Sequence, residues 1–141
     1  MVRVVLDTNI LVAGLRSRQG ASFQVLKQIG DRRITPLLTI SLFLEYEAVL
    51  KRPEHAIVHR FAAKEIDEIL AEIAALGEPV DVHFLWRPQL TDPSDEMVLE
   101  AMVNGRGDAL ITHNVQDFEK AAGRFGVNLL TPAQFLQGRG Q

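Results

Sequence analysis

Short strand-like runs alternate with helix-like segments along the chain, and this alternation limits the fold more than any other feature of the sequence. The predicted strands are apolar and rich in β-branched residues, and they cover residues 2–6, 34–39, 80–84, 109–112 and 127–130. The predicted helices cover residues 10–15, 21–29, 41–50, 54–60, 64–76, 92–103 and 117–125, followed by a terminal helix that begins at Thr131 and Pro132. Strands separated by helices favour a mostly parallel sheet. We therefore expect residues 1–141 to form one three-layer α/β/α domain with four or five strands.

Several helix ends are predicted from the chemistry of single residues. Ser41 is expected to cap the helix at 41–50, and Pro53 is expected to end it. Gly30 and Gly77 are expected to stop the helices that precede them. The helix at 64–76 carries an apolar stripe, which indicates an amphipathic helix.

The composition excludes several kinds of site. The chain has no cysteine, so a metal ion could be held only by oxygen ligands or histidine. The net charge of −3 argues against a general nucleic-acid-binding protein. Basic residues nevertheless gather at Lys51, Arg52, His55 and Arg60, where they form either a strip for RNA phosphates or an ordinary solvated helix face. No apolar run is long enough to span a membrane, and the first residues resemble a strand and not a signal peptide, so a cytoplasmic protein is expected.

Two carboxylates stand out in the first half of the chain. Asp7 ends the first predicted strand, where open α/β sheets bind their ligands, although it is equally suited to cap the next helix. Glu45 falls at the edge of the apolar face of its helix, one turn from Leu42 and Val49. A glutamate at such an edge is ordinarily solvated, and it gains interest only if that edge faces a cleft.

The second half of the chain offers further polar candidates. Asp95 lies in line with the apolar side of its helix, but Asp92 and Asp95 could also form the N-terminal cap of that helix around Pro93. The two roles are compatible if Asp92 caps and Asp95 faces the cleft. Asn114 and Asp117 follow the strand at 109–112, either at the same cleft or as an ordinary turn in which Asp117 caps the next helix.

Carboxylates gathered at strand ends and helix starts repel one another unless a cation lies among them. Mg²⁺ or Mn²⁺ suits such a site because both prefer oxygen ligands. An ion of this kind can activate water and stabilise charge on a phosphodiester. No Ser–His arrangement is expected, since His55, His59, His83 and His113 show no nucleophile partner in the sequence.

The chain resembles a PIN domain over nearly its whole length. The resemblance rests on the order and spacing of several short motifs: Val-Leu-Asp7-Thr8-Asn9-Ile, Ser41 through Glu45 with Val49-Leu50, Asp92-Pro-Ser-Asp95, and Ile111-Thr112-His-Asn114 before Asp117-Phe118. Within the family, the VapC-like toxins of toxin–antitoxin systems are the most similar group.

This resemblance implies a Mg²⁺- or Mn²⁺-dependent ribonuclease that forms a homodimer, cleaves RNA and pairs with an antitoxin protein. Asp7, Glu45 and Asp95 match the core acids of the family by position. Asp7 and Asp95 would bind the ion, while Glu45 would complete the set and orient the attacking water. The family carries a fourth acid after the threonine of the late strand, where this chain has Asn114. Either Asn114 would hold a metal-bound water, or Asp117 would compensate for the missing charge. Asn9, Asp92 and Thr112 resemble the polar residues that support the acids, and Lys51, Arg52, His55 and Arg60 would contact RNA phosphates.

Two other functions are alternatives to RNA cleavage. Because Asn114 brings no charge, the chain could instead be an inactive module that binds RNA or an antitoxin peptide. The apolar stripe at 66–76 would then serve a dimer or a partner groove, although core packing accounts for it as well. Phosphoryl transfer through Asp7 is disfavoured, since haloacid-dehalogenase-like enzymes carry a second aspartate where this chain has Asn9.

Overall fold

A computed structural model describes residues 1–83 and 89–138. Within these residues the strands are β1 (Val2–Leu6), β2 (Ile34–Leu38), β3 (Glu78–Pro79), β4 (Ala109–Ile111) and β5 (Leu129–Leu130). The helices are α1 (Thr8–Arg16), α2 (Ala21–Gly30), α3 (Ile40–Leu50), α4 (Pro53–His59), α5 (Ala63–Leu76), α6 (Pro93–Gly105), α7 (Val115–Phe125) and α8 (Pro132–Gln137). No helix of this part of the chain combines the length and the apolar character that crossing a bilayer requires.

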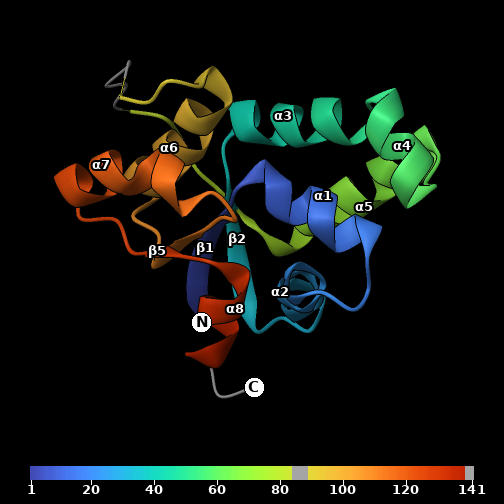
Figure 1. The fold of residues 1–141 in the computed structure, drawn as a ribbon, viewed down its shortest axis with the longest axis horizontal. Coiled ribbons are helices and arrows are strands. Elements are labelled where there is room, and N and C mark those ends of the chain that lie inside the picture. The colour runs from blue at the N-terminus through green and yellow to red at the C-terminus, as the bar shows by residue number, and fades with distance from the viewer. Residues whose placement is uncertain (84–88, 139–141) are drawn as a thin grey trace.

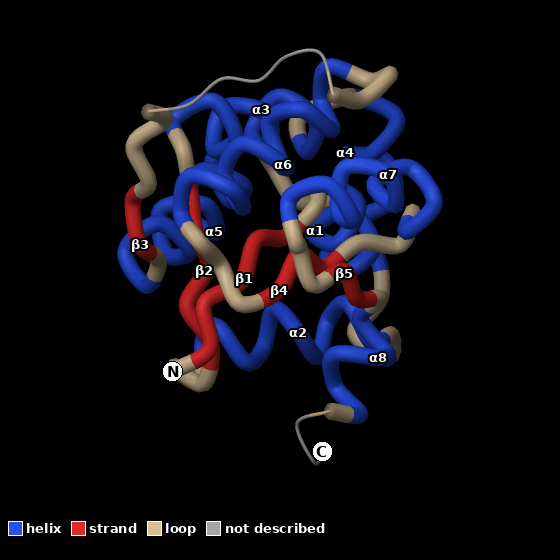
Figure 2. The backbone as a smooth tube through the Cα atoms, turned by 90° about the vertical axis from the view of Figure 1, so that its left-hand side faces the viewer, coloured by secondary structure: helices blue, strands red, loops and turns tan. Residues whose placement is uncertain are grey.

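The strands form one parallel sheet in the order β3-β2-β1-β4-β5. Figure 2 shows them side by side in this order, surrounded by helices. The chain moves from β1 through β2 to β3, then crosses back to place β4 and β5 on the other side of β1. The direction of winding therefore reverses between β1 and β4, and open α/β sheets bind ligands at such a switch point. The expected α/β/α architecture is confirmed, and every strand pair described is parallel.

The helices divide into two layers with the sheet between them (Figure 1). Helices α1, α2 and α5 pack together on one side, with α8 against α2, while α6 and α7 cover the other side. Helix α3 runs across the carboxyl ends of the strands, from α6 at one end to α4 at the other (Figure 1). The centre of the sheet is fully buried, as at Val4, Leu37 and Leu110, and each such side chain stabilises the fold by about 1.5–3 kcal/mol.

Several predicted boundaries are wrong, and local chemistry explains them. Thr39, not Ser41, caps α3, because its hydroxyl oxygen accepts the Leu42 N–H at 3.0 Å. Gly30 is the last residue of α2, not the residue after it. The predicted end of α3 at Leu50 is confirmed, and Pro53 begins α4, since proline lacks the N–H that the first helical position does not use. Helix α7 begins at Val115, and its N-cap residue is Asn114 instead of the expected Asp117. In place of the strand expected at 80–84, the structure has the short β3 just before it; residue 84 lies outside the described residues.

Candidate metal centre

Asp7 lies at the switch point, between the ends of β1 and β4. Its backbone N–H donates to the Ile111 carbonyl at 2.9 Å, which joins the end of β1 to the end of β4. The carboxylate is buried, and its Oδ2 accepts the Thr112 hydroxyl at 2.6 Å. Asp7 is the N-cap residue of α1 by position, but its side chain accepts no capping bond there. Helix capping alone therefore does not account for this carboxylate.

Thr112 fixes the orientation of that carboxylate. Its hydroxyl is fully buried and accepts the Asn114 N–H at 2.9 Å, which leaves its own hydrogen for Asp7. Asn9 Oδ1 accepts the His113 N–H at 3.5 Å, a longer contact that ties the same loop to α1. The structure thus brings Asn9 and Thr112, both expected to support the acids, to the Asp7 side of the switch point.

Helix α3 is anchored beside Asp7 by a tyrosine. The buried Tyr46 hydroxyl donates to the carbonyl of Leu6, the last residue of β1, at 2.5 Å. Burial and the negative charge of Asp7 both raise the pKa of this phenol. The neighbouring Glu45 is half-buried, and its Oε2 accepts the Ser94 hydroxyl at 3.4 Å. The edge of α3 that carries Glu45 therefore faces the start of α6, where Asp92 and Asp95 lie.

The two aspartates at the start of α6 have different surroundings. Asp92 caps the helix, because its Oδ1 accepts the Ser94 N–H at 2.9 Å and Pro93 takes the first helical position. Within the described residues, no hydrogen bond from the Asp92 N–H to the Asp95 carboxylate closes a reciprocal cap. Asp95 instead lines a polar hollow of about 790 Å³ between α6 and α7. The residues around this polar hollow include Thr91, Asp92, Asp95, Gln116, Asp117 and Lys120.

Electrostatics show that the acids converge. Burial raises the pKa of Asp95 to about 7, and the charges of Asp7, Asp92, Asp117 and Glu96 contribute to the rise. Burial likewise raises the pKa of Asp7; the Thr112 hydroxyl and the Thr8 N–H lower it in part, whereas the charge of Asp117 raises it further. Asp7, Asp95 and Asp117 come from three separate helix starts, yet the charges of Asp7 and Asp117 both act on Asp95, and the charge of Asp117 acts on Asp7.

Asn114 and Asp117 differ in their position relative to the polar hollow. Asn114 is exposed, and its side chain makes no capping bond at the start of α7. Asp117 is also exposed, but it lines the polar hollow together with Asp95. The structure therefore brings Asp117 toward the acids from the first turn of α7.

The oxygen donors fit a hard divalent ion bound partly through water. Among residues 1–83 and 89–138, no three His, Asp or Glu side chains are close enough to hold an ion directly as they lie. Mg²⁺, however, usually binds one or two carboxylates and keeps several waters. The hydroxyl of Thr8, next to Asp7, is buried and has no hydrogen-bond partner within the described residues. Unrelieved repulsion among acids and an unpartnered buried hydroxyl are both consistent with a cation at this place.

The predicted basic residues lie elsewhere. Lys51 is held by Asp67 at 2.6 Å and Glu47 at 3.0 Å, hydrogen bonds that raise its pKa. Arg52 and Arg60 are exposed and flank α4, whereas His55 is half-buried. Figure 1 places α4 at the far end of α3 from α6 and α7. None of these residues is among the described residues that line the polar hollow.

Three contacts at the site have no signal in the sequence. The expectation that no histidine has a hydroxyl partner is wrong, because His113 Nε2 lies 2.7 Å from Ser22 Oγ. Ser22 is only 3% exposed, so this pair ties α2 to the loop after β4 and offers no accessible nucleophile. Glu96 is buried and accepts the N–H groups of Gln89 and Leu90 at 2.5 and 2.6 Å, which fixes the segment leading into α6. The bond from Tyr46 to β1 is the third such contact, since the spacing of Tyr46 in the sequence indicates only an apolar helix face.

Comparison with known families agrees with this arrangement. A family model described as PIN domain matches residues 3–116, a range that includes Asp7, Glu45, Asp95 and Asn114 and ends just before Asp117. No curated protein matches the chain.

Proposed function

The chain belongs to the PIN domain family, whose members are generally nucleases, and from this premise we propose that it is a Mg²⁺- or Mn²⁺-dependent endoribonuclease that acts as the toxin of a toxin–antitoxin pair. The observation that carries the proposal is the convergence of carboxylates at the switch point. Burial and the charge of Asp117 raise the pKa of Asp7 there, and burial and the charges of Asp7 and Asp117 raise the pKa of Asp95. Glu45 reaches the same helix start through Ser94. Acids arranged at such a cost in stability are characteristic of functional sites.

Each residue of the proposed metal centre has a separate role. Asp7 and Asp95 would hold the ion, with Glu45 and Asp117 completing the set. A bound divalent ion supplies positive charge to the phosphodiester and favours ionisation of water. Thr112 holds the Asp7 carboxylate in one orientation through its 2.6 Å hydrogen bond, and Tyr46 holds α3 so that Glu45 faces the site. Glu45, which is only half-buried, would orient the attacking water.

The proposal is tested by cleavage of a labelled single-stranded RNA. Cleavage is expected with Mg²⁺ or Mn²⁺ and is expected to stop with EDTA. Asp7→Asn should slow cleavage by about 100-fold or more, the effect of removing one group that stabilises charge in a transition state. Asp31→Asn, at the exposed end of α2, is the matched control and should cleave at the wild-type rate. Equal rates for Asp7→Asn and wild type, with both variants folded by circular dichroism, would remove the nuclease assignment.

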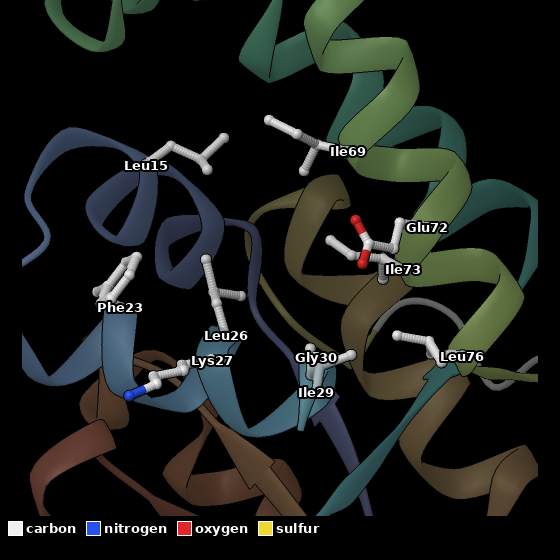
Figure 3. A pocket seen from close by; sticks show the side chains of 10 residues that line it. All are labelled: Leu15, Phe23, Leu26, Lys27, Ile29, Gly30, Ile69, Glu72, Ile73 and Leu76. Carbon is white, nitrogen blue, oxygen red and sulfur yellow. The ribbon is translucent and has the colours of Figure 1, made fainter. Parts of the chain in front are cut away.

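An apolar groove on the other side of the sheet supports a second candidate, a module that binds an antitoxin peptide. Figure 3 shows Leu15 of α1 and Phe23 and Leu26 of α2 across from Ile69 and Leu76 of α5. The groove has a volume of about 210 Å³. The stripe on α5 is therefore divided: its most buried side chains belong to the core, while Ile69 and Leu76 line the groove.

The two candidates differ in what they predict for RNA and for the groove. Tight RNA binding without turnover stimulated by Mg²⁺ or Mn²⁺ would favour the binding module over the nuclease. A homodimer is proposed in either case, and sedimentation velocity of Ile69→Asp measures whether the groove takes part in it. The groove would be assigned to another partner if this variant sediments like the wild-type dimer.

A further inference from the structure

Among the described residues that line the polar hollow, one is a cation, Lys120, and four are acids. Lys120 lies three residues after Asp117 on α7, which puts the two Cβ atoms about 5–6 Å apart on one helix face. Both side chains line the polar hollow, as do Asp92 and Asp95 from the start of α6. Lys120 takes part in none of the ion pairs found among the described residues. Its charge is thus placed beside the acids without being neutralised by one of them in a salt bridge.

The next basic residue on α7 is used differently. Arg124 donates a hydrogen bond to the side-chain carbonyl of Gln89, in the segment that leads into α6. That bond joins α7 to the rim of the polar hollow and has a structural role. Lys120 lies one turn earlier and is exposed, and of the described residues that line the polar hollow it alone is basic.

The size and lining of the polar hollow indicate what it can hold. Its volume of about 790 Å³ is within the usual range for small-ligand sites, about 300–1,000 Å³, and is sufficient for a nucleotide. None of the described residues that line it is aromatic, so this part of the lining offers no surface on which a base could stack. Hydroxyl, amide and ammonium groups suit a sugar–phosphate backbone, whose contacts position a strand without reading its sequence.

We propose that the polar hollow holds the sugar–phosphate of the nucleotide next to the cleaved bond and that Lys120 binds its phosphate. This inference rests on the proposed function, in which RNA is the substrate, and it adds where the RNA strand continues beyond the acids. The acids that line the polar hollow would otherwise repel that phosphate, and Lys120 supplies the opposite charge among them; these acids are Asp92, Asp95, Asp117 and Glu119. Binding through Lys120 is therefore independent of base sequence.

Salt dependence of RNA binding tests this contact directly. Affinity for single-stranded RNA oligonucleotides of two unrelated sequences is measured by fluorescence anisotropy from 50 to 200 mM salt, with Ca²⁺ in place of Mg²⁺. One phosphate contact on a single strand contributes about 0.7 to the slope of log affinity against log salt, or about fivefold in affinity at 0.1 M salt. Lys120→Gln should lower both the salt slope and the affinity by these amounts, equally for the two sequences. Lys120→Arg should restore the slope and the affinity. Arg32→Gln removes a charge at the opposite, amino-terminal edge of β2 and should leave both quantities unchanged.

The outcomes separate this inference from the proposed function. An unchanged slope in Lys120→Gln, equal losses in Lys120→Gln and Arg32→Gln, or absence of RNA binding by the wild type would each overturn the phosphate contact. Wild-type binding that depends on Lys120 but leads to no metal-stimulated cleavage would overturn the nuclease and leave the contact in place.

Discussion

Replacing Asp95 with asparagine should make the metal-free protein more stable above neutral pH, although it removes a residue proposed for catalysis. The pKa of Asp95 lies near 7 in the folded chain, against an ordinary value of 3.8, because of burial and four neighbouring acids. Such a rise means that the folded state prefers the protonated form, so ionisation of Asp95 costs folding stability. The cost is absent below about pH 4 and complete above about pH 7. The asparagine of the Asp95→Asn variant would carry no charge at any pH and would avoid this cost.

The magnitude follows from the difference in pKa. A difference of about three pKa units corresponds to about 4 kcal/mol at 1.36 kcal/mol per unit. Asp95 is half-buried, however, and solvent screening reduces this value to about 1–2 kcal/mol. For a chain of 141 residues this amounts to a rise in Tm of about 3–6 °C at pH 8. The gain should shrink as the pH falls and should vanish near pH 4.

Thermal and urea denaturation in EDTA measure the effect at pH 8 and pH 4.5. Glu119→Gln is the matched control, because Glu119 lines the polar hollow but does not contribute to the raised pKa of Asp95. This control should change the unfolding free energy by less than about 0.5 kcal/mol. Adding Mg²⁺ should reverse the order: at 100 times its Kd, the ion would stabilise wild type by about 2.7 kcal/mol and Asp95→Asn by less. Lower stability of Asp95→Asn than of wild type at pH 8 in EDTA would show that the acids do not repel one another as the structure indicates.

Two further predictions concern the supports of Asp7 and the fourth acid. Thr112→Val removes the donor to Asp7 and leaves the Asn114 N–H without its partner, so urea denaturation should show a loss of about 2–4 kcal/mol in the free energy of unfolding. Thr112→Ser keeps the hydroxyl and should lose less than half of that; equal losses would mean that packing and not the hydroxyl matters. Asp117→Asn should weaken Mn²⁺ binding, measured by calorimetry, by about tenfold or more, whereas Asn114→Ala should change it less than threefold; the opposite ranking would place the fourth ligand at Asn114.

The fold was predictable because its strongest signals are local. The run at β1, the amphipathic stripe of α5 and the Thr131–Pro132 start of α8 each depend on residues close together in the chain, and each prediction is confirmed. The end of α5 at Gly77 is likewise confirmed. The strand expected at residues 80–84 does not form over the described residues 80–83, because β2 ends at Leu38, whose carbonyl accepts the Val80 N–H at 2.8 Å. In the structure β3 pairs with the end of β2 over two residues, at Glu78 and Pro79.

The site was predictable only in part, because its supports join residues distant in sequence. Polar side chains that follow strands indicate a common edge, and this reasoning pointed to Asp7, Asn114 and Asp117. Asp95 was indicated by its place in line with the apolar side of its helix. The bond from Tyr46 to Leu6 spans 40 residues, and the pair of Ser22 and His113 spans 91. Such contacts depend on how helices pack over the sheet, which no periodicity in the sequence encodes. The basic stretch at 51–60 illustrates the same limit, since Lys51 finds its partners on α3 and α5, away from the polar hollow.

The gathering of acids at the switch point is tolerable because of where each acid lies on its helix. Asp95 and Asp117 both occupy the first turn of a helix, and Asp7 immediately precedes α1. The positive end of the helix dipole stabilises a nearby anion by about 0.3–1 kcal/mol, so three helix starts offset part of the repulsion. At the start of α7 this favourable position belongs to Asp117, because Asn114 lies before the first turn and its N–H is already bound to Thr112. We therefore place the fourth carboxylate of the proposed centre at Asp117, one helical turn after the position at which the resemblance to the family locates it.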